Sequence, residues 1–220
     1  MKTAVFLTVL CISIELGAYQ VSPIWGPPVE VVSAESAISR NQVYRVSASP
    51  DKGFYWPYFF TIPDSLKPNL PILFIPNNDG QIDIEPIQRE YFSAIINEEG
   101  FSHLGKKLGV VTFTPSFPRP RIEPGERNLY LHALTRESLL TTNPTWTRLD
   151  RQVLAMKSDL HRRLSAAGIE TDSKLINYGF SAAADFVTRF TAIQPQHVKA
   201  MVAGGLGGLP ILPVTSFKDK

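Results

Sequence analysis

Apolar residues follow two different periods along the chain. A continuous apolar run at residues 70–75 is typical of a strand covered on both faces. Residues 109–113 predict a second strand and residues 198–203 a further buried strand. Apolar residues that recur every three or four positions predict amphipathic helices, and these lie at residues 87–98, around 130–140 and at 147–168. Residues 147–150 resemble a helix capping box, with Asp150 in the place of the usual Glu or Gln.

The first sheet-forming segments have a different character. Residues 38–48 and 54–62 show rough alternation and aromatic content, and they flank a turn at residues 49–53. This pattern predicts an antiparallel hairpin. The strands that alternate with helices after it imply right-handed crossovers and parallel pairing. We therefore expect an α/β fold with a mostly parallel sheet, an N-terminal antiparallel hairpin and helices on both faces.

One serine stands between a strand and a helix. Residues 174–180 read as a buried strand, and the helix from Ala182 onward carries its apolar side chains on one face. Strand, serine and helix together are the arrangement of a nucleophile elbow, whose strained turn needs small residues two positions before and after the serine. Gly179 and Ala183 occupy those places around Ser181. We therefore expect Ser181 to lie in a strained turn and to be a catalytic candidate.

The predicted loops point to the same edge of the sheet. In a parallel sheet, ligands bind beyond the carboxyl ends of the strands. The loops at residues 76–80 and 114–120 and the turn at Ser181 all follow strands. We expect the site where these three segments meet.

Composition narrows the class of protein. With 220 residues, 44% hydrophobic and 19% charged, the chain is long enough for a core of one domain. The net charge of +2 is small and the Lys and Arg residues are scattered, so we expect no nucleic-acid partner. His and carboxylate residues show no metal-ligand spacing, so we expect no metal and no cofactor.

The N-terminal residues resemble a secretory signal. Lys2 is followed by an apolar run at residues 4–14 and by small residues ending at Ala18. A buried N-terminal strand or helix is the alternative, and the run is too short to span a membrane. We expect a signal at residues 1–18, an arm at 19–37 and one domain at 38–220, in a secreted or periplasmic protein. Cleavage after Ala18 would remove Cys11, the single cysteine.

Four segments carry a resemblance to a known family. Residues 73–80, 117–120, 130–134 and 179–183 resemble the α/β-hydrolase superfamily, in its secreted esterase and polyhydroxyalkanoate-depolymerase branches. The resemblance covers residues 38–213.

The resemblance implies that Ser181 attacks the carbonyl of a small or polymeric ester. It further implies that the N–H of Ala182 and that of Asn77 or Asn78 hold the oxyanion, and that a histidine is the base. Many esterases have His-Gly where this chain has Asn77-Asn78, so which of the two donates stays open.

The family's acid and histidine follow the serine in the chain. After Ser181, His197 precedes the strand at residues 198–203, which places it at the opposite end of the sheet. Asp185 lies one helical turn beyond the serine and Asp219 lies in a polar tail. The sequence therefore predicts a nucleophile without its partners, on an α/β-hydrolase-like chain that is incomplete at its C-terminal end.

The remaining polar candidates have two interpretations each. His132 could play a polar role in binding at the rim of the site, or be a structural histidine bonded to backbone. Arg119 and Arg121 could bind a substrate carboxylate, or be solvated loop residues. We expect His103 and His161 to be exposed on helices.

Two hypotheses about function remain. The first is a serine hydrolase of carboxylic esters, present as an incomplete chain. The second is a non-catalytic α/β-hydrolase-like binding protein or an inactive fragment. If the chain ends soon after the buried strand at residues 198–203, that strand has an unpaired edge, so we expect self-association, whereas a stable monomer would favour the binding protein.

Overall fold

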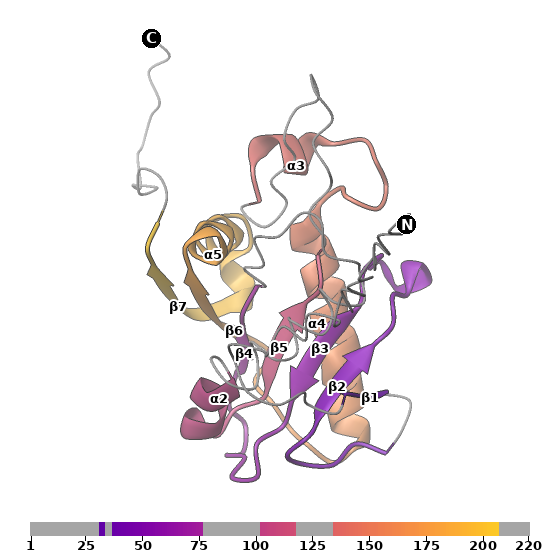
Figure 1. Ribbon diagram of the computed structural model, residues 1–220, viewed down its shortest axis with the longest axis vertical. Helices are drawn as coiled ribbons and strands as arrows, with labels where there is room; N and C mark the ends of the chain where they lie inside the picture. Colours follow the sequence, from indigo (N-terminus) through magenta and orange to yellow (C-terminus); the bar gives the residue numbers. More distant parts are fainter. Residues whose placement is uncertain (1–30, 34–36, 77–101, 118–133, 207–220) are drawn as a thin grey trace, which may run out of the picture.

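The computed structural model describes residues 31–33, 37–76, 102–117 and 134–206 (Figure 1). The predicted signal, the predicted helix at residues 87–98 and the residues Asn77, Asn78, Arg119, Arg121 and His132 lie outside these ranges.

The described strands form one mixed sheet. They are β1 (Val31–Ser33), β2 (Val43–Val46), β3 (Tyr58–Thr61), β4 (Ile72–Phe74), β5 (Thr112–Pro115), β6 (Leu175–Phe180) and β7 (Val198–Gly204). Their order across the sheet is β1-β2-β3-β5-β4-β6-β7. β3 is antiparallel to both of its neighbours, and every other pair is parallel. The predicted hairpin and the mostly parallel sheet are confirmed.

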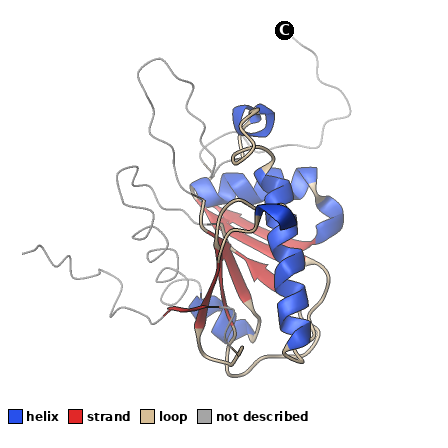
Figure 2. Ribbon diagram, turned by 90° about the vertical axis from the view of Figure 1, so that its right-hand side faces the viewer, coloured by secondary structure: helices blue, strands red, loops and turns tan. Residues whose placement is uncertain are grey.

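Helices cover both faces of the sheet, as the sequence predicted. They are α2 (Ser102–Leu108), α3 (Arg136–Leu140), α4 (Leu149–Ala166) and α5 (Ala182–Ile193). Because successive side chains of a strand point to opposite faces, Ile72 and Phe74 of β4 pack in the core with α4 and α5, whereas Leu73 packs near Leu104 of α2. Figure 2 shows the sheet nearly edge-on, with α4 along one side.

Aromatic rings join the central strands to α5. The ring of Phe74 lies 5.4 Å from that of Phe113 on β5 and 5.5 Å from that of Phe190 on α5. All three side chains are fully buried, and each contributes about 2–3 kcal/mol by leaving water. This packing holds α5, and with it the turn before α5, in a fixed position on the sheet.

Residues 198–203 form a strand, as predicted, but the prediction that this strand is buried is wrong. The segment is β7, and it has β6 on one side and, among the described strands, no neighbour on the other. Met201 is 39% exposed and Val202 is 55% exposed. The residue types are those of a buried strand, but burial depends on neighbours that a local pattern does not reveal.

The predicted capping box is also wrong. The residue at the N-cap of α4 is Arg148, with a left-handed backbone (φ 46°), and no side chain caps the helix there. Asp150 instead accepts hydrogen bonds from Arg148 Nε (2.8 Å) and Nη2 (2.6 Å) and from Gln194 Nε2 (2.8 Å). Burial acts to raise the pKa of Asp150, but these bonds hold it below its usual value. The buried carboxylate fastens the start of α4 to the end of α5.

His161 is half-buried on α4, which contradicts the prediction that it is exposed. Its Nδ1 lies 2.8 Å from Thr171 Oγ1. Within the described part of the chain, no helix has the length and apolar character needed to cross a membrane.

Candidate active site

Ser181 lies in the turn between β6 and α5. Its backbone angles are φ 56° and ψ −125°, a sparsely populated conformation for any residue other than glycine. The carbonyl of Ser181 accepts the N–H groups of Ala184 (2.9 Å) and Asp185 (3.2 Å), which starts the helix. The predicted strained strand-to-helix turn is confirmed, and the serine is exposed at its apex.

Gly179 makes this turn sterically feasible. A Cβ atom on Gly179 would lie 2.3 Å from the carbonyl oxygen and 2.4 Å from the carbonyl carbon of Ala183. Ala183 itself is buried against the sheet. The first turn of α5 therefore approaches the end of β6 so closely that only glycine fits at position 179.

The end of β7 supports the elbow from the other side. The N–H of Ser181 donates to the carbonyl oxygen of Gly204 at 2.8 Å. A Cβ atom on Gly204 would lie 3.2 Å from the ring of Phe180, and one on Gly205 would lie 3.0 Å from it. This support was not predicted from the sequence, in which the run of glycines at residues 204–208 was the available signal.

Backbone donors lie next to the serine. The first N–H groups of a helix have no partner within the helix and carry the positive end of its dipole. Ala182 is the first residue of α5, so its N–H is one of these donors and lies next to Ser181. The second predicted donor, Asn77 or Asn78, lies outside the described residues, as does His132.

β4 ends at the same edge of the sheet as β6, the strand that leads into the elbow. Phe74 of β4 pairs with Asn177 of the parallel neighbour β6. Both strands therefore end at the same edge of the sheet, where Pro76 leads toward Asn77 and Phe180 leads to Ser181.

Sequence comparisons contribute no relative: no protein-family model matches the chain, and no curated protein matches it. Solved structures do match. An acetyl xylan esterase from Aspergillus awamori is 16% identical over 74% of this chain and 52% of its own, with a TM-score of 0.48. A poly(3-hydroxybutyrate) depolymerase from Bordetella parapertussis is 18% identical over 75% and 51%, with a TM-score of 0.44.

An S-formylglutathione hydrolase from Agrobacterium tumefaciens is 12% identical over 76% of this chain and 60% of its own, with a TM-score of 0.44. The chain thus spans about half the length of the first structures it matches. The architecture itself follows from the sheet order, the antiparallel β3 and an elbow at the carboxyl end of β6, a parallel strand with neighbours on both sides. The fold is α/β-hydrolase-like.

A base for an α/β-hydrolase-like site is absent from the vicinity of Ser181 in the described residues. His197 ends the short 3-10 helix η4 (Pro195–His197) just before β7. Val198 pairs with Leu175 at one end of β6, and Gly204 pairs with Phe180 at the other. At about 3.3 Å per residue, this separates His197 from the elbow by about 20 Å. The predicted placement of His197 at the far end of the sheet is confirmed.

Two other features are also unsuited to the chemistry. His161 lies on α4 beside Thr171. Thr171 belongs to the segment that leads to the amino end of β6, whereas Ser181 follows the carboxyl end of that strand. A groove of about 640 Å³ lies between α3 and the C-terminal half of α5, lined by Leu134, Thr135, Arg136, Leu139, Leu140, Arg189, Ala192 and Ile193. Neither Ser181 nor Ala182 borders this groove.

Proposed function

We propose that the protein is a serine hydrolase of carboxylic esters and that Ser181 is its nucleophile. The observation that carries the proposal is the strained backbone of Ser181 between β6 and α5. Such a turn exposes the serine Oγ above the sheet and places it beside the first N–H groups of the helix. The steric requirement for glycine at position 179 supports the proposal, because it shows that the sequence around Ser181 is suited to this strained turn.

In the proposed reaction, Ser181 Oγ forms a bond to the ester carbonyl carbon and loses its proton to a base. The carbonyl electron pair moves to oxygen, where the N–H of Ala182 and that of Asn77 or Asn78 stabilise the negative charge. The C–O bond to the alcohol then breaks, and the alcohol takes a proton as it leaves. Water hydrolyses the remaining acyl-serine, so the products are a carboxylic acid and an alcohol.

The substrate is a small or polymeric ester, and His132 contributes a polar contact at the rim of the site. The base and its acid come from outside the described residues, because the histidines whose side chains are described lie far from Ser181. We also propose that residues 1–18 direct export, so that the protein acts outside the cytoplasm.

Trapping of the acyl group tests the proposal. The chain is exposed to excess p-nitrophenyl acetate, quenched and analysed by peptide mass spectrometry. If no base reaches Ser181, water attacks the acyl-serine slowly, so acetyl-Ser181 accumulates while turnover stays near background. The Ser181→Ala variant should lose this label, and Ser158→Ala, an exposed serine on α4, should keep it. Absence of acetyl on Ser181 in the unaltered chain, together with no turnover that Ser181→Ala removes, would contradict the proposal.

The second candidate is a non-catalytic binding protein on the same scaffold. It is favoured by one observation, the absence of a described histidine near Ser181. It predicts no acetyl-Ser181 under the same conditions. A rapid turnover that Ser181→Ala abolishes would instead show that a base lies within the chain.

A further inference from the structure

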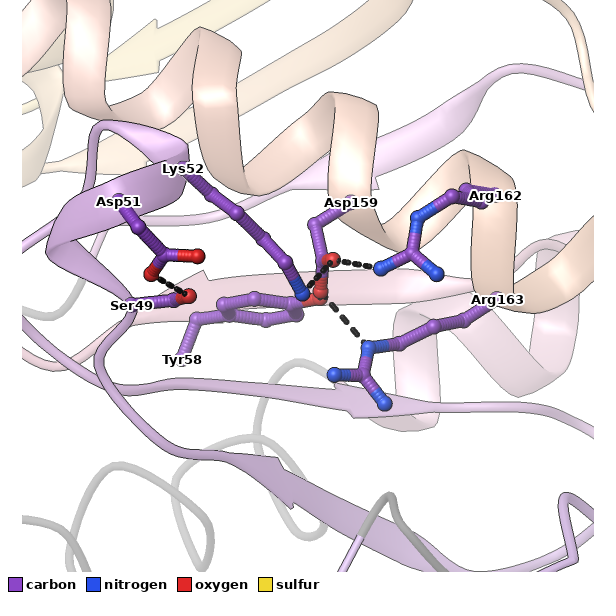
Figure 3. Close-up of polar contacts among 7 residues, drawn as sticks. All are labelled: Ser49, Asp51, Lys52, Tyr58, Asp159, Arg162 and Arg163. Carbon is purple, nitrogen blue, oxygen red and sulfur yellow. Dashed lines mark hydrogen bonds and ion pairs between the residues drawn. The ribbon is translucent and has the colours of Figure 1, made fainter.

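A buried carboxylate away from the elbow binds an unusual number of cations (Figure 3). Asp159 of α4 accepts hydrogen bonds from Tyr58 Oη (2.8 Å) and Arg163 Nε (2.7 Å) at Oδ2. At Oδ1 it accepts hydrogen bonds from Lys52 Nζ (3.1 Å) and from Arg162 Nη2. Lys52 belongs to the 3-10 helix η1 (Pro50–Lys52) in the β2–β3 hairpin, so the cluster ties the hairpin to α4.

Part of this cluster has a structural role. The side chain of Asp159 is 1% exposed and that of Arg163 is 12% exposed. A buried carboxylate is stable when one cation and its hydrogen-bond donors satisfy it, and Arg163 with Tyr58 meets this need. Burial acts to raise the pKa of Asp159, but these bonds and those of Lys52 and Arg162 hold it well below its usual range. Asp159 is therefore ionised, and Arg163 is the least exposed of its three cationic partners.

Lys52 and Arg162 are positive charges beyond that need. Their side chains are 41% and 62% exposed. Because both donate to the same oxygen of Asp159, their nitrogen atoms lie within about 6 Å of each other, the sum of two hydrogen-bond lengths. Two like charges held this close repel each other, and each retains N–H donors directed away from Asp159.

The nearest carboxylate in sequence, that of Asp51, attracts the charge of Lys52 but forms no direct ion pair with it among the described contacts. Asp51 precedes Lys52, but its Oδ1 accepts a hydrogen bond from Ser49 Oγ at 2.6 Å. Figure 3 shows the Asp51 carboxylate beside Ser49 and apart from the ammonium group of Lys52. The exposed side of the cluster therefore presents two cations, Lys52 and Arg162, and hydrogen bonds to the buried carboxylate of Asp159 hold both in place.

We propose that Lys52 and Arg162 form a binding site for a tetrahedral dianion, phosphate or sulfate, either free or as a monoester on a larger molecule. A tetrahedral oxyanion has acceptor oxygens on several sides, so one can accept from Lys52 Nζ while another accepts from the Arg162 guanidinium. Asp159 is a positioning residue, since it fixes both cations before the anion arrives. The site is independent of the proposed ester hydrolysis.

Titration calorimetry on the full chain tests this site, with inorganic phosphate, inorganic sulfate and glucose 6-phosphate at one ionic strength set by sodium chloride. Acetate is the probe for a planar monoanion. Lys52→Ala and Arg162→Ala each remove one proposed contact. Arg151→Ala, an exposed arginine on the same helix, removes an equal charge about 16 Å away along the helix axis.

We expect saturable binding of the dianions that weakens by about tenfold in Lys52→Ala and in Arg162→Ala and is unchanged in Arg151→Ala. Binding of glucose 6-phosphate alone would identify a monoester as the source of the anion, and equal binding of inorganic phosphate would identify the free ion. Circular dichroism in chloride establishes that each variant is folded. Absence of saturable binding to the unaltered chain, equal binding of acetate, or equal loss in Arg151→Ala would overturn the proposal.

Discussion

The carbonyl oxygen of Ala183 lies where a side chain on Gly179 would have to be, 2.3 Å from an added Cβ atom. No real Cβ makes such a contact without movement of the neighbouring backbone. The contact joins the last part of β6 to the first turn of α5, on either side of Ser181. The backbone geometry of Ser181 therefore depends on the absence of a Cβ atom at Gly179.

Gly179→Ala should lower the free energy of unfolding by about 3 kcal/mol, because the methyl group must displace the backbone of α5. Urea denaturation followed by circular dichroism measures the change. Gly168→Ala is the control, since a Cβ there meets no atom within 4 Å and only its left-handed backbone (φ 74°) adds strain. That strain amounts to about 1 kcal/mol. Equal losses in the two variants would show that the close approach at Gly179 does not matter.

Local rules were enough to place the elbow. Small residues at positions 179 and 183, between an apolar run and an amphipathic helix, predicted a turn that the structure contains. The same rules failed at Asp150, because its partner Gln194 is 44 residues away in the chain. They failed again at β7 and at His161, where burial depends on tertiary neighbours. The hydrogen bond from the N–H of Ser181 to the carbonyl of Gly204 joins two separate segments. No local sequence pattern predicts it, apart from the run of glycines that begins at Gly204.

Asp150→Asn should destabilise the fold by about 2 kcal/mol. The substitution removes the charge that pairs with Arg148 and leaves an amide N–H₂ facing the donors of Arg148 and Gln194. Asp172→Asn is the matched control, because the Asp172–Lys199 pair is exposed and exposed pairs contribute at most about 1 kcal/mol. Thermal unfolding compares the two. A smaller effect at position 150 than at position 172 would contradict the assigned role of Asp150.

His161 should make stability depend on pH. Burial, and after it the charge of Lys157, lower the pKa of His161, and its Nε2 is buried without a hydrogen-bond partner among the described residues. The unfolded chain therefore takes up a proton near its ordinary pKa of about 6.5, before the folded chain does. This contribution to stability is complete above that pH and is lost as the pH falls through the lower, folded pKa.

Urea unfolding between about pH 5 and 7.5 measures the slope in this window. The variant His161→Gln keeps a polar group for Thr171 but has no titrating ring, so its slope should be shallower. His197, whose pKa burial also lowers, should account for part of the slope that remains. Identical slopes in the variant and the unaltered chain would exclude His161 as the source.

We further propose that the chain self-associates through β7. An edge strand presents unpaired N–H and C=O groups to other chains, and the exposed side chains of Met201 and Val202 add apolar surface. Sedimentation velocity at micromolar concentration should show species larger than a monomer. Val202→Lys should reduce them, because a charge on an edge strand opposes pairing. Leu140→Lys, at an exposed position on α3, should not. A stable monomer with a sharp cooperative melt would contradict this prediction.

The nucleophilic role of Ser181 is the central claim, and boron-11 NMR of phenylboronic acid mixed with the chain tests it most directly. A serine Oγ beside N–H donors adds to boron and makes a tetrahedral adduct that resembles the intermediate of ester hydrolysis. We predict a tetrahedral boron signal that is present in the unaltered chain and in Ser158→Ala and is lost in Ser181→Ala. No tetrahedral signal in the unaltered chain, or an equal signal in Ser181→Ala, would contradict the claim.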